Sequence, residues 1–181
     1  LAAEPPSAPF FRVELSGVLR DRHLVALLYA LGRARQAAGV ALVVIDSPGG
    51  SRRVSLLIHE VLLKSPVPVV AYVPPGGRAL AGAAVALYAA RYVAMAPDAR
   101  IGSTLDLGLD VLRHSGFGER FLLASDVVPS ASRDWFLLML AEGIVSDAPD
   151  ASKRGLIDFV ATDERALRRR LGGQLLSVSP S

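Results

Sequence analysis

Three predicted strands alternate with two predicted helices in the first half of the chain. Residues 40–45 and 67–73 are almost continuously apolar, which is typical of strands buried on both faces. Residues 11–15 alternate apolar and polar side chains, as expected of a strand with one exposed face. The two segments between these strands carry apolar residues at helical spacing. This β-α-β-α-β order predicts an α/β fold, with a mainly parallel sheet built from repeated β-α units and flanked by helices.

Capping residues set the expected ends of the helices. Asp21 is expected to cap the first helix and Ser51 the second. A third helix, rich in small residues, is expected over residues 80–90. Later segments predict short strands at 92–96 and 101–102 and a short helix within a weakly patterned stretch at 106–132. They also predict helices at 133–141 and 163–171, a short helix capped by Ser146 and ended by Gly155, and a strand at 156–161.

The chain of 181 residues is expected to form one domain over residues 11–171, between a Pro-rich leader (1–10) and a flexible tail (172–181). Its first residue is leucine, which suggests a processed N-terminus. A net charge of +3 with one short arginine cluster does not favour a nucleic-acid groove. The absence of cysteine excludes disulfides and a cysteine nucleophile. No apolar run approaches the roughly 20 residues of a membrane-spanning helix.

Two glycine-containing segments carry the candidate chemistry. Asp46-Ser-Pro-Gly-Gly50 follows a buried strand, and Gly76-Gly-Arg-Ala-Leu-Ala-Gly-Ala-Ala84 lies about thirty residues later. Glycines let backbone N–H groups turn outward at the carboxyl end of a parallel sheet, where they can stabilise a developing oxyanion. For the pentapeptide alone, an ordinary turn between a strand and a helix is an equally good interpretation.

Taken together, these segments resemble the ClpP-class serine peptidases. The resemblance is greatest to the NfeD-type membrane-associated peptidases, a branch related to signal peptide peptidase A. It covers roughly residues 11–171 and implies a ClpP/crotonase-like fold. The matching stretches are residues 41–50, 65–73, 74–83, 94–97, 101–102 and 146–161.

The resemblance also assigns site residues, and two of them depart from the family pattern. The nucleophilic serine falls on Ala81, while Gly49, Gly50 and Gly82 take the oxyanion-hole positions. The NfeD-type base is a lysine after the Ile-Gly strand, and Arg120 is the tentative occupant of that place. Arginine stays protonated and cannot act as a base. The only two lysines, Lys64 and Lys153, lie outside that region, so both members of the Ser-Lys dyad are expected to be missing.

Other candidate catalytic groups carry weaker signals. His114 with Asp126 has the order of a ClpP-like triad but no serine to activate. Ser103 is either a displaced nucleophile or, as we favour, a turn-capping residue. The remaining histidines, His23 and His59, are expected to be partly exposed on helices. Asp106 and Asp110 could share a helix side but have no histidine beside them, so neither a metal nor another cofactor is predicted.

The resulting functional hypothesis is a non-catalytic relative of these peptidases. It would bind a peptide or membrane-protein segment, with a stomatin-type protein as one partner, and would form a homodimer or higher homo-oligomer. The resemblance implies an extracytoplasmic domain of a membrane-anchored precursor. One alternative is an active membrane-associated serine endopeptidase whose serine was replaced by Ala81. A second is a crotonase-type acyl-CoA enzyme, which lacks a clear acid/base pair here.

Overall fold

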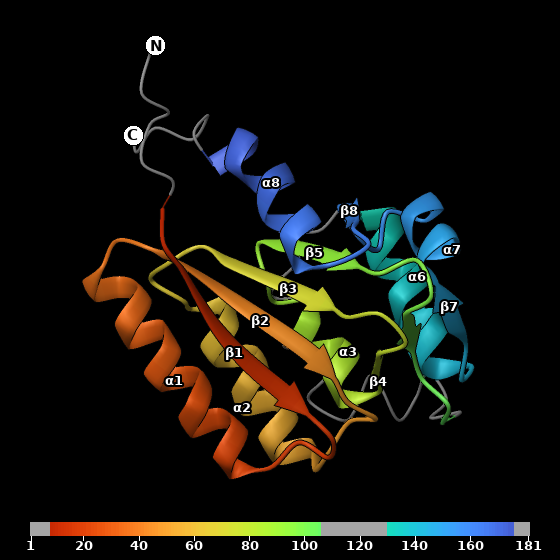
Figure 1. Cartoon of the computed structure of the whole chain (residues 1–181). Coiled ribbons are helices and arrows are strands. Elements are labelled where there is room, and N and C mark those ends of the chain that lie inside the picture. Colours follow the sequence, from red (N-terminus) through yellow and green to blue (C-terminus); the bar gives the residue numbers. More distant parts are fainter. Residues whose placement is uncertain (1–7, 106–129, 176–181) are drawn as a thin grey trace.

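A five-stranded parallel sheet forms the centre of the molecule (Figure 1). The computed structural model describes residues 8–105 and 130–175. Within them the main sheet has the order β1-β2-β3-β5-β8, and every neighbouring pair is parallel. The predicted parallel α/β architecture is therefore confirmed. The strands are β1 (Phe10–Ser16), β2 (Val40–Asp46), β3 (Val69–Val73), β5 (Tyr92–Met95) and β8 (Phe159–Val160).

Helices cover both faces of this sheet (Figure 1). On one face α1 (Asp21–Gln36) packs on β1 and β2, α2 (Arg52–Leu63) packs beside α1, and α3 (Gly82–Leu87) packs against α2. On the other face lies α8 (Glu164–Leu175), to which Arg12 of β1 bonds through Glu164. The last helix was expected to stop at Gly172-Gly173, but it continues to Leu175, and the position of a Cβ on Gly172 is open space.

A second, three-stranded sheet lies beside the first. It contains β4 (Arg78–Leu80), β6 (Arg100–Gly102) and β7 (Val145–Asp147), where β4 and β6 are parallel and β6 and β7 antiparallel. Two further helices, α6 (Ser130–Ala141) and α7 (Ala148–Lys153), flank it. The helix predicted over residues 80–90 was wrong at its start. The Ser47 N–H donates to Arg78 O and the Leu80 N–H donates to Ser47 O, so this backbone is held extended.

Of three predicted helix caps, one is right and two are wrong. Ser146 lies in β7, and Asp147 caps α7, since its Oδ1 accepts the Asp150 N–H at 2.9 Å. Ser51 caps α2 as predicted, since its Oγ accepts the Val54 N–H at 3.3 Å. Asp21 is instead the first residue of α1, and Arg20 occupies the N-cap position. The His23 ring explains the shift, because its Nδ1 accepts the Arg20 backbone N–H at 3.0 Å. The side chain of His23, inside the helix, thus accepts the backbone N–H of the N-cap residue Arg20.

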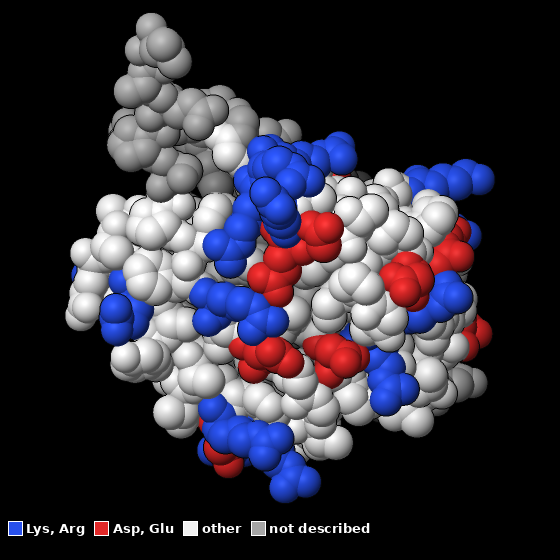
Figure 2. Space-filling view, viewed as in Figure 1, with Lys and Arg blue, Asp and Glu red and all other residues white. Residues whose placement is uncertain are grey.

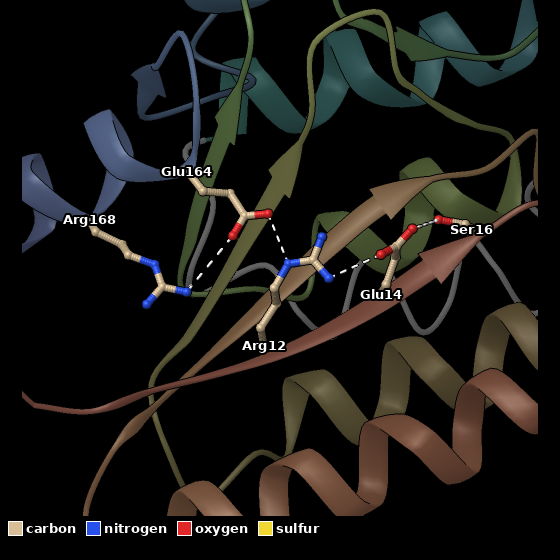
Figure 3. A network of polar contacts seen from close by, with 5 residues as sticks. All are labelled: Arg12, Glu14, Ser16, Glu164 and Arg168. Carbon is tan, nitrogen blue, oxygen red and sulfur yellow. Dashed lines mark hydrogen bonds and ion pairs between the residues drawn. The ribbon is translucent and has the colours of Figure 1, made fainter.

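An ion-pair network on the exposed face of β1 holds α8 in place (Figure 3). The Arg12 guanidinium donates to Glu164 Oε1 at 2.9 Å and to Glu14 Oε2 at 3.0 Å, and Ser16 Oγ donates to Glu14. These groups are about 30–50% exposed, so the pairs orient α8 but contribute only about 0–1 kcal/mol each. Figure 2 shows that basic and acidic side chains lie side by side on this face.

Tyr72 is a buried core residue whose ionisation should make the protein sensitive to alkaline pH. Its side chain is fully buried and its hydroxyl donates to Ala161 O at 3.0 Å. Burial, assisted by the charges of Asp163 and Glu164, raises the pKa of Tyr72 to about 12.

The folded protein therefore keeps a proton that the unfolded chain releases near pH 10. The free energy of unfolding should fall as the pH rises from about 10 to 12. Urea unfolding of Tyr72→Phe should show a shallower decline over this range, together with a loss of about 1 kcal/mol at neutral pH for the missing hydrogen bond. A decline as steep as that of the unchanged protein would contradict this assignment.

Among the helices that the structure describes, none is both long and apolar enough to cross a bilayer.

Candidate functional site

Ala81 occupies a strained turn between β4 and α3. Its backbone angles are φ 49° and ψ −118°, a combination that side chains with a Cβ avoid and that costs of order 1–3 kcal/mol. The surrounding structure enforces it, because the Ala81 N–H donates to Gly102 O at 2.7 Å. A sharp strand-to-helix turn with strained angles is the geometry that presents a nucleophile in many hydrolases. We call residues 80–82 the elbow.

The Gly-Gly turn at the end of β2 is fixed by a buried serine. Ser47 is fully buried, and its Oγ accepts the Gly49 N–H at 3.0 Å. Gly49 has φ +105°, which only glycine adopts readily, and its carbonyl accepts the Leu19 N–H at 2.9 Å. Gly50 is held just as closely, since a Cβ there would lie 2.7 Å from the Leu19 Cβ. The turn therefore has little freedom to move.

The Gly-Gly turn lies directly against the elbow. A Cβ on Gly49 would stand 3.4 Å from both the Ala81 Cβ and the Gly82 nitrogen. A Cβ on Gly82 would stand 4.0 Å from the Gly50 nitrogen. Gly50 is exposed, and Ala81 and Gly82 are partly exposed, so this junction is open to solvent.

At this junction, two backbone N–H groups have no acceptor in the part of the chain that the structure describes. Gly82 is the first residue of α3, where an N–H has no partner within the helix. Within residues 8–105 and 130–175, neither the Gly82 N–H nor the Gly50 N–H donates to another described group. Gly49 was also expected to contribute an N–H, but Ser47 Oγ already accepts it. Gly50 and Gly82 therefore carry the two N–H groups of this junction that no described group accepts.

Ser55, on α2, lies directly behind the elbow. It is fully buried, and its Oγ has no hydrogen-bond partner in the described part of the chain. It presses on Gly82, because a Cβ there would stand 2.6 Å from the Ser55 Cβ and closer still to its Oγ. A buried hydroxyl without a partner is unusual in a folded protein and calls for an explanation.

The two described histidines were expected to be partly exposed, and this was wrong. His59 is 2% exposed because it turns toward α3, where its Nδ1 lies 2.8 Å from Val85 O. His23 is 6% exposed because its ring closes the start of α1. Burial, with the nearby Arg22 charge, lowers the pKa of His23. His59 therefore joins α2 to α3, and His23 closes the first turn of α1.

The other candidate groups do not meet at the elbow. Ser103 Oγ donates to Leu105 O and accepts the Leu105 N–H, as the favoured turn-capping interpretation predicts. Lys64 follows the last residue of α2, about 18 Å along the axis from the start of that helix, and it pairs with Glu60 at 2.8 Å. Lys153 is exposed on α7. Five predicted candidates lie outside the described residues: Asp106, Asp110, His114, Arg120 and Asp126.

Sequence reasoning missed the two serines that shape this site. Ser47 had a readable signal, since a serine two residues before a glycine often accepts that N–H in a turn. Ser55 had none, because a serine on the buried side of an amphipathic helix resembles a tolerated core residue. Within the described ranges, no three His, Cys, Asp or Glu side chains gather in a way that could hold a metal ion.

Known proteins match this chain in shape rather than in sequence. No protein-family model matches it, and no curated protein matches it by sequence. A serine-to-alanine mutant of the 1510-N membrane-bound stomatin-specific protease superimposes with a TM-score of 0.75, at 21% identity, over 90% of this chain and 84% of that chain.

A lysine-to-alanine mutant of the same protease, in complex with a substrate peptide, gives a TM-score of 0.72 at 22% identity, over 89% of this chain and 78% of that chain. ClpP1 from Listeria monocytogenes gives a TM-score of 0.68 at 12% identity, over 87% of this chain and 94% of that chain. The chain therefore has the fold of the ClpP-like proteases, in agreement with the predicted fold class.

Proposed function

We propose that this chain is a non-catalytic ClpP-like domain of the NfeD type that binds peptide segments. The observation that carries the proposal is the elbow. Ala81 holds the strained backbone of a nucleophile, beside two available N–H donors, but ends in a methyl group. Acyl transfer needs a hydroxyl or thiol at that point. The two N–H groups can still bind an oxygen of a ligand, but no side chain at position 81 can attack a substrate to form a covalent bond.

The lysines support the loss of catalysis. A base must lie within about 3 Å of the hydroxyl it activates, directly or through one water. Lys64 lies beyond the far end of α2 and is paired with Glu60, and Lys153 lies on a different helix, α7. Arg120, the tentative occupant of the base position, would remain protonated. Restoring a serine at position 81 would therefore not restore a dyad.

Peptide binding is the activity that best fits the groups left at the site, which has N–H donors but no nucleophile or base. Two backbone donors at a partly exposed turn suit a backbone oxygen of an extended peptide. A similar fold carries a substrate peptide in the stomatin-specific protease. By this likeness we propose a peptide or membrane-protein segment as ligand, with a stomatin-type protein as one source. We further propose self-association as a dimer or higher oligomer, and an extracytoplasmic position in a membrane-anchored precursor.

Labelling with a fluorophosphonate probe tests the loss of catalysis. The unchanged chain and Ala81→Ser should both remain unlabelled and should not cleave a casein or peptide substrate above background. The unchanged chain has no hydroxyl at position 81, and the Ala81→Ser variant has a hydroxyl without a base to activate it. The closely related Ala83→Ser, in the buried core of α3, serves as the matched control.

Each contrary result has a distinct meaning. Labelling of the unchanged chain would show that a nucleophile lies elsewhere and would overturn the proposal. Labelling and proteolysis by Ala81→Ser alone would show that a base is present, and would favour the alternative of an active serine endopeptidase whose serine was replaced.

A further inference from the structure

We propose that two copies of this chain associate edge to edge, with their β1 strands antiparallel and Arg12 of each copy opposite Glu14 of the other. This interface rests on the self-association proposed above and specifies its surface and its register. The open edge of β1, the charges along that strand and the exposed helix beside it support the interface.

β1 is a long and regular edge strand. It stands at one end of the main sheet, and β2 is its one neighbour among the described strands (Figure 1). All seven of its residues pair with β2 in one continuous register, and none of them is proline. Natural proteins often blunt a sheet edge by shortening it, bulging it or placing proline on it. β1 shows none of these three devices.

The hydrogen bonds to β2 show which backbone groups of β1 point outward. Pro9 O accepts the Val40 N–H, and the Gly17 N–H donates to Asp46 O, both at 2.9 Å. In a parallel ladder, these bonds assign the odd-numbered residues of β1 to β2. The even-numbered residues therefore turn their N–H and C=O groups to the open edge. Within the described ranges, these outward backbone groups have no partner at three positions: Phe10, Arg12 and Glu14.

This alternation limits how two β1 strands can pair. In an antiparallel pair, residues that exchange hydrogen bonds lie directly opposite each other, so an even-numbered residue must face an even-numbered one. Three such registers bring the middles of the strands together: Arg12 opposite Arg12, Arg12 opposite Glu14, or Glu14 opposite Glu14. Opposite charges across a pair of strands stabilise it, and like charges destabilise it. The second register is therefore favoured, and two-fold symmetry makes the Arg12–Glu14 pair occur twice.

The alternating sign of charge distinguishes this edge from a protected one. Arg12 and Glu14 point to the same side of the sheet (Figure 3) and are 42% and 52% exposed. Hydrogen bonds from Ser16 and Arg12 lower the pKa of Glu14, so both charges are present at neutral pH. Charges of a single sign would repel a second copy in every register. Opposite signs two residues apart attract it in one.

The apolar side of β1 fits the same register. The two-fold axis passes beside Val13, and Phe11 of each copy lies opposite Leu15 of the other. Val13 and Leu15 are buried, and Phe11 is partly buried. Apolar residues therefore face apolar residues on this side of the joined sheet.

The helix beside the edge lacks a cover. α1 packs on β1, and three of its large apolar side chains, Val25, Leu28 and Tyr29, are exposed by 66%, 51% and 66%. A two-fold axis normal to the sheet keeps equivalent faces together, so the second copy brings its own α1 to the same face. α1 also carries three arginines and one aspartate, which opposes the approach of a second α1. The strand contacts must therefore supply the attraction.

Analytical ultracentrifugation of charge-reversal variants of the whole chain tests the interface. The unchanged chain should sediment as a dimer. Arg12→Glu and Glu14→Arg should each weaken dimerisation by about tenfold or more, because each creates two like-charged pairs across the axis. An equimolar mixture of the two variants should dimerise again, since each arginine of one chain then faces a glutamate of the other.

Two controls separate the edge from general effects. Glu142→Arg, at an exposed position just beyond α6, makes the same change in net charge as Glu14→Arg and should leave dimerisation unchanged. Circular dichroism of both β1 variants should match that of the unchanged chain, which would exclude unfolding as the cause of a lost dimer.

The outcomes distinguish this interface from self-association in general. Dimers that persist in both single variants would overturn pairing through β1 and leave self-association standing at another surface. A chain that stays monomeric at about 1 mM, where even weak association is visible, would overturn both. Loss of the dimer in the single variants without recovery in their mixture would overturn the register.

Discussion

Replacing Gly82 with alanine is expected to lower the free energy of unfolding by about 1–2 kcal/mol. A Cβ at this position would stand 2.6 Å from the Ser55 Cβ, so α2 and α3 must move apart, and overpacking of this kind costs about 1–3 kcal/mol. Alanine is the better helix former by up to about 1 kcal/mol, which offsets part of the loss. Urea unfolding followed by circular dichroism measures the difference.

The same clash predicts a rescue. Ser55→Gly removes both atoms that the new methyl group meets, so the double variant should be more stable than the sum of the two single effects by about 1–2 kcal/mol. Gly172→Ala is the matched control, because it lies in α8 with open space at its Cβ position, and it should be neutral or stabilising. Equal effects of Gly82→Ala and Gly172→Ala would contradict contact between Ser55 and the elbow.

The central sheet could be predicted because its signals are local. The apolar runs of β2 and β3 are long, and the helices between them have clear apolar faces. The second sheet was predicted only in part. The strand expected at 101–102 lies within β6, whereas β4 and β7 were not predicted, because each is three residues long and owes its extended form to a partner far along the chain. Leu80 was expected to begin a small-residue helix, but it lies in β4, where its N–H donates to Ser47 O.

The candidate site was likewise predicted only in part. The glycines and Ala81 could be named in advance because the two segments that contain them resemble the ClpP-class peptidases. The sequence could not show which glycine N–H lacks an acceptor, because that depends on the direction of the Ser47 hydroxyl. The role of Ser55 is also hidden, since it follows from how closely α2 approaches α3 across the elbow. Close approach is a tertiary property, and helical spacing alone does not encode it.

Gly102→Ala is expected to have the largest effect of any glycine substitution near the site, a loss of about 3 kcal/mol or more. Gly102 has φ +144°, a backbone region open almost only to glycine. A Cβ there would also meet the Ile144 carbonyl and stand 2.9 Å from the Val145 Cα, and neither is a flexible side-chain end. Conformational strain and a backbone clash therefore add.

Gly102→Ala is also expected to disturb the backbone of the elbow, because Gly102 O accepts the Ala81 N–H that holds the strained turn. Gly17→Ala separates the two causes. Gly17 has φ +70° but nothing within 4 Å of its Cβ position, so it should lose only about 1–2 kcal/mol of conformational energy. Chemical unfolding gives both values, and the NMR amide shifts of Ala81 and Gly82 report the elbow. If Gly102→Ala proved no more harmful than Gly17→Ala, β6 could not be the support that keeps the Ala81 backbone strained.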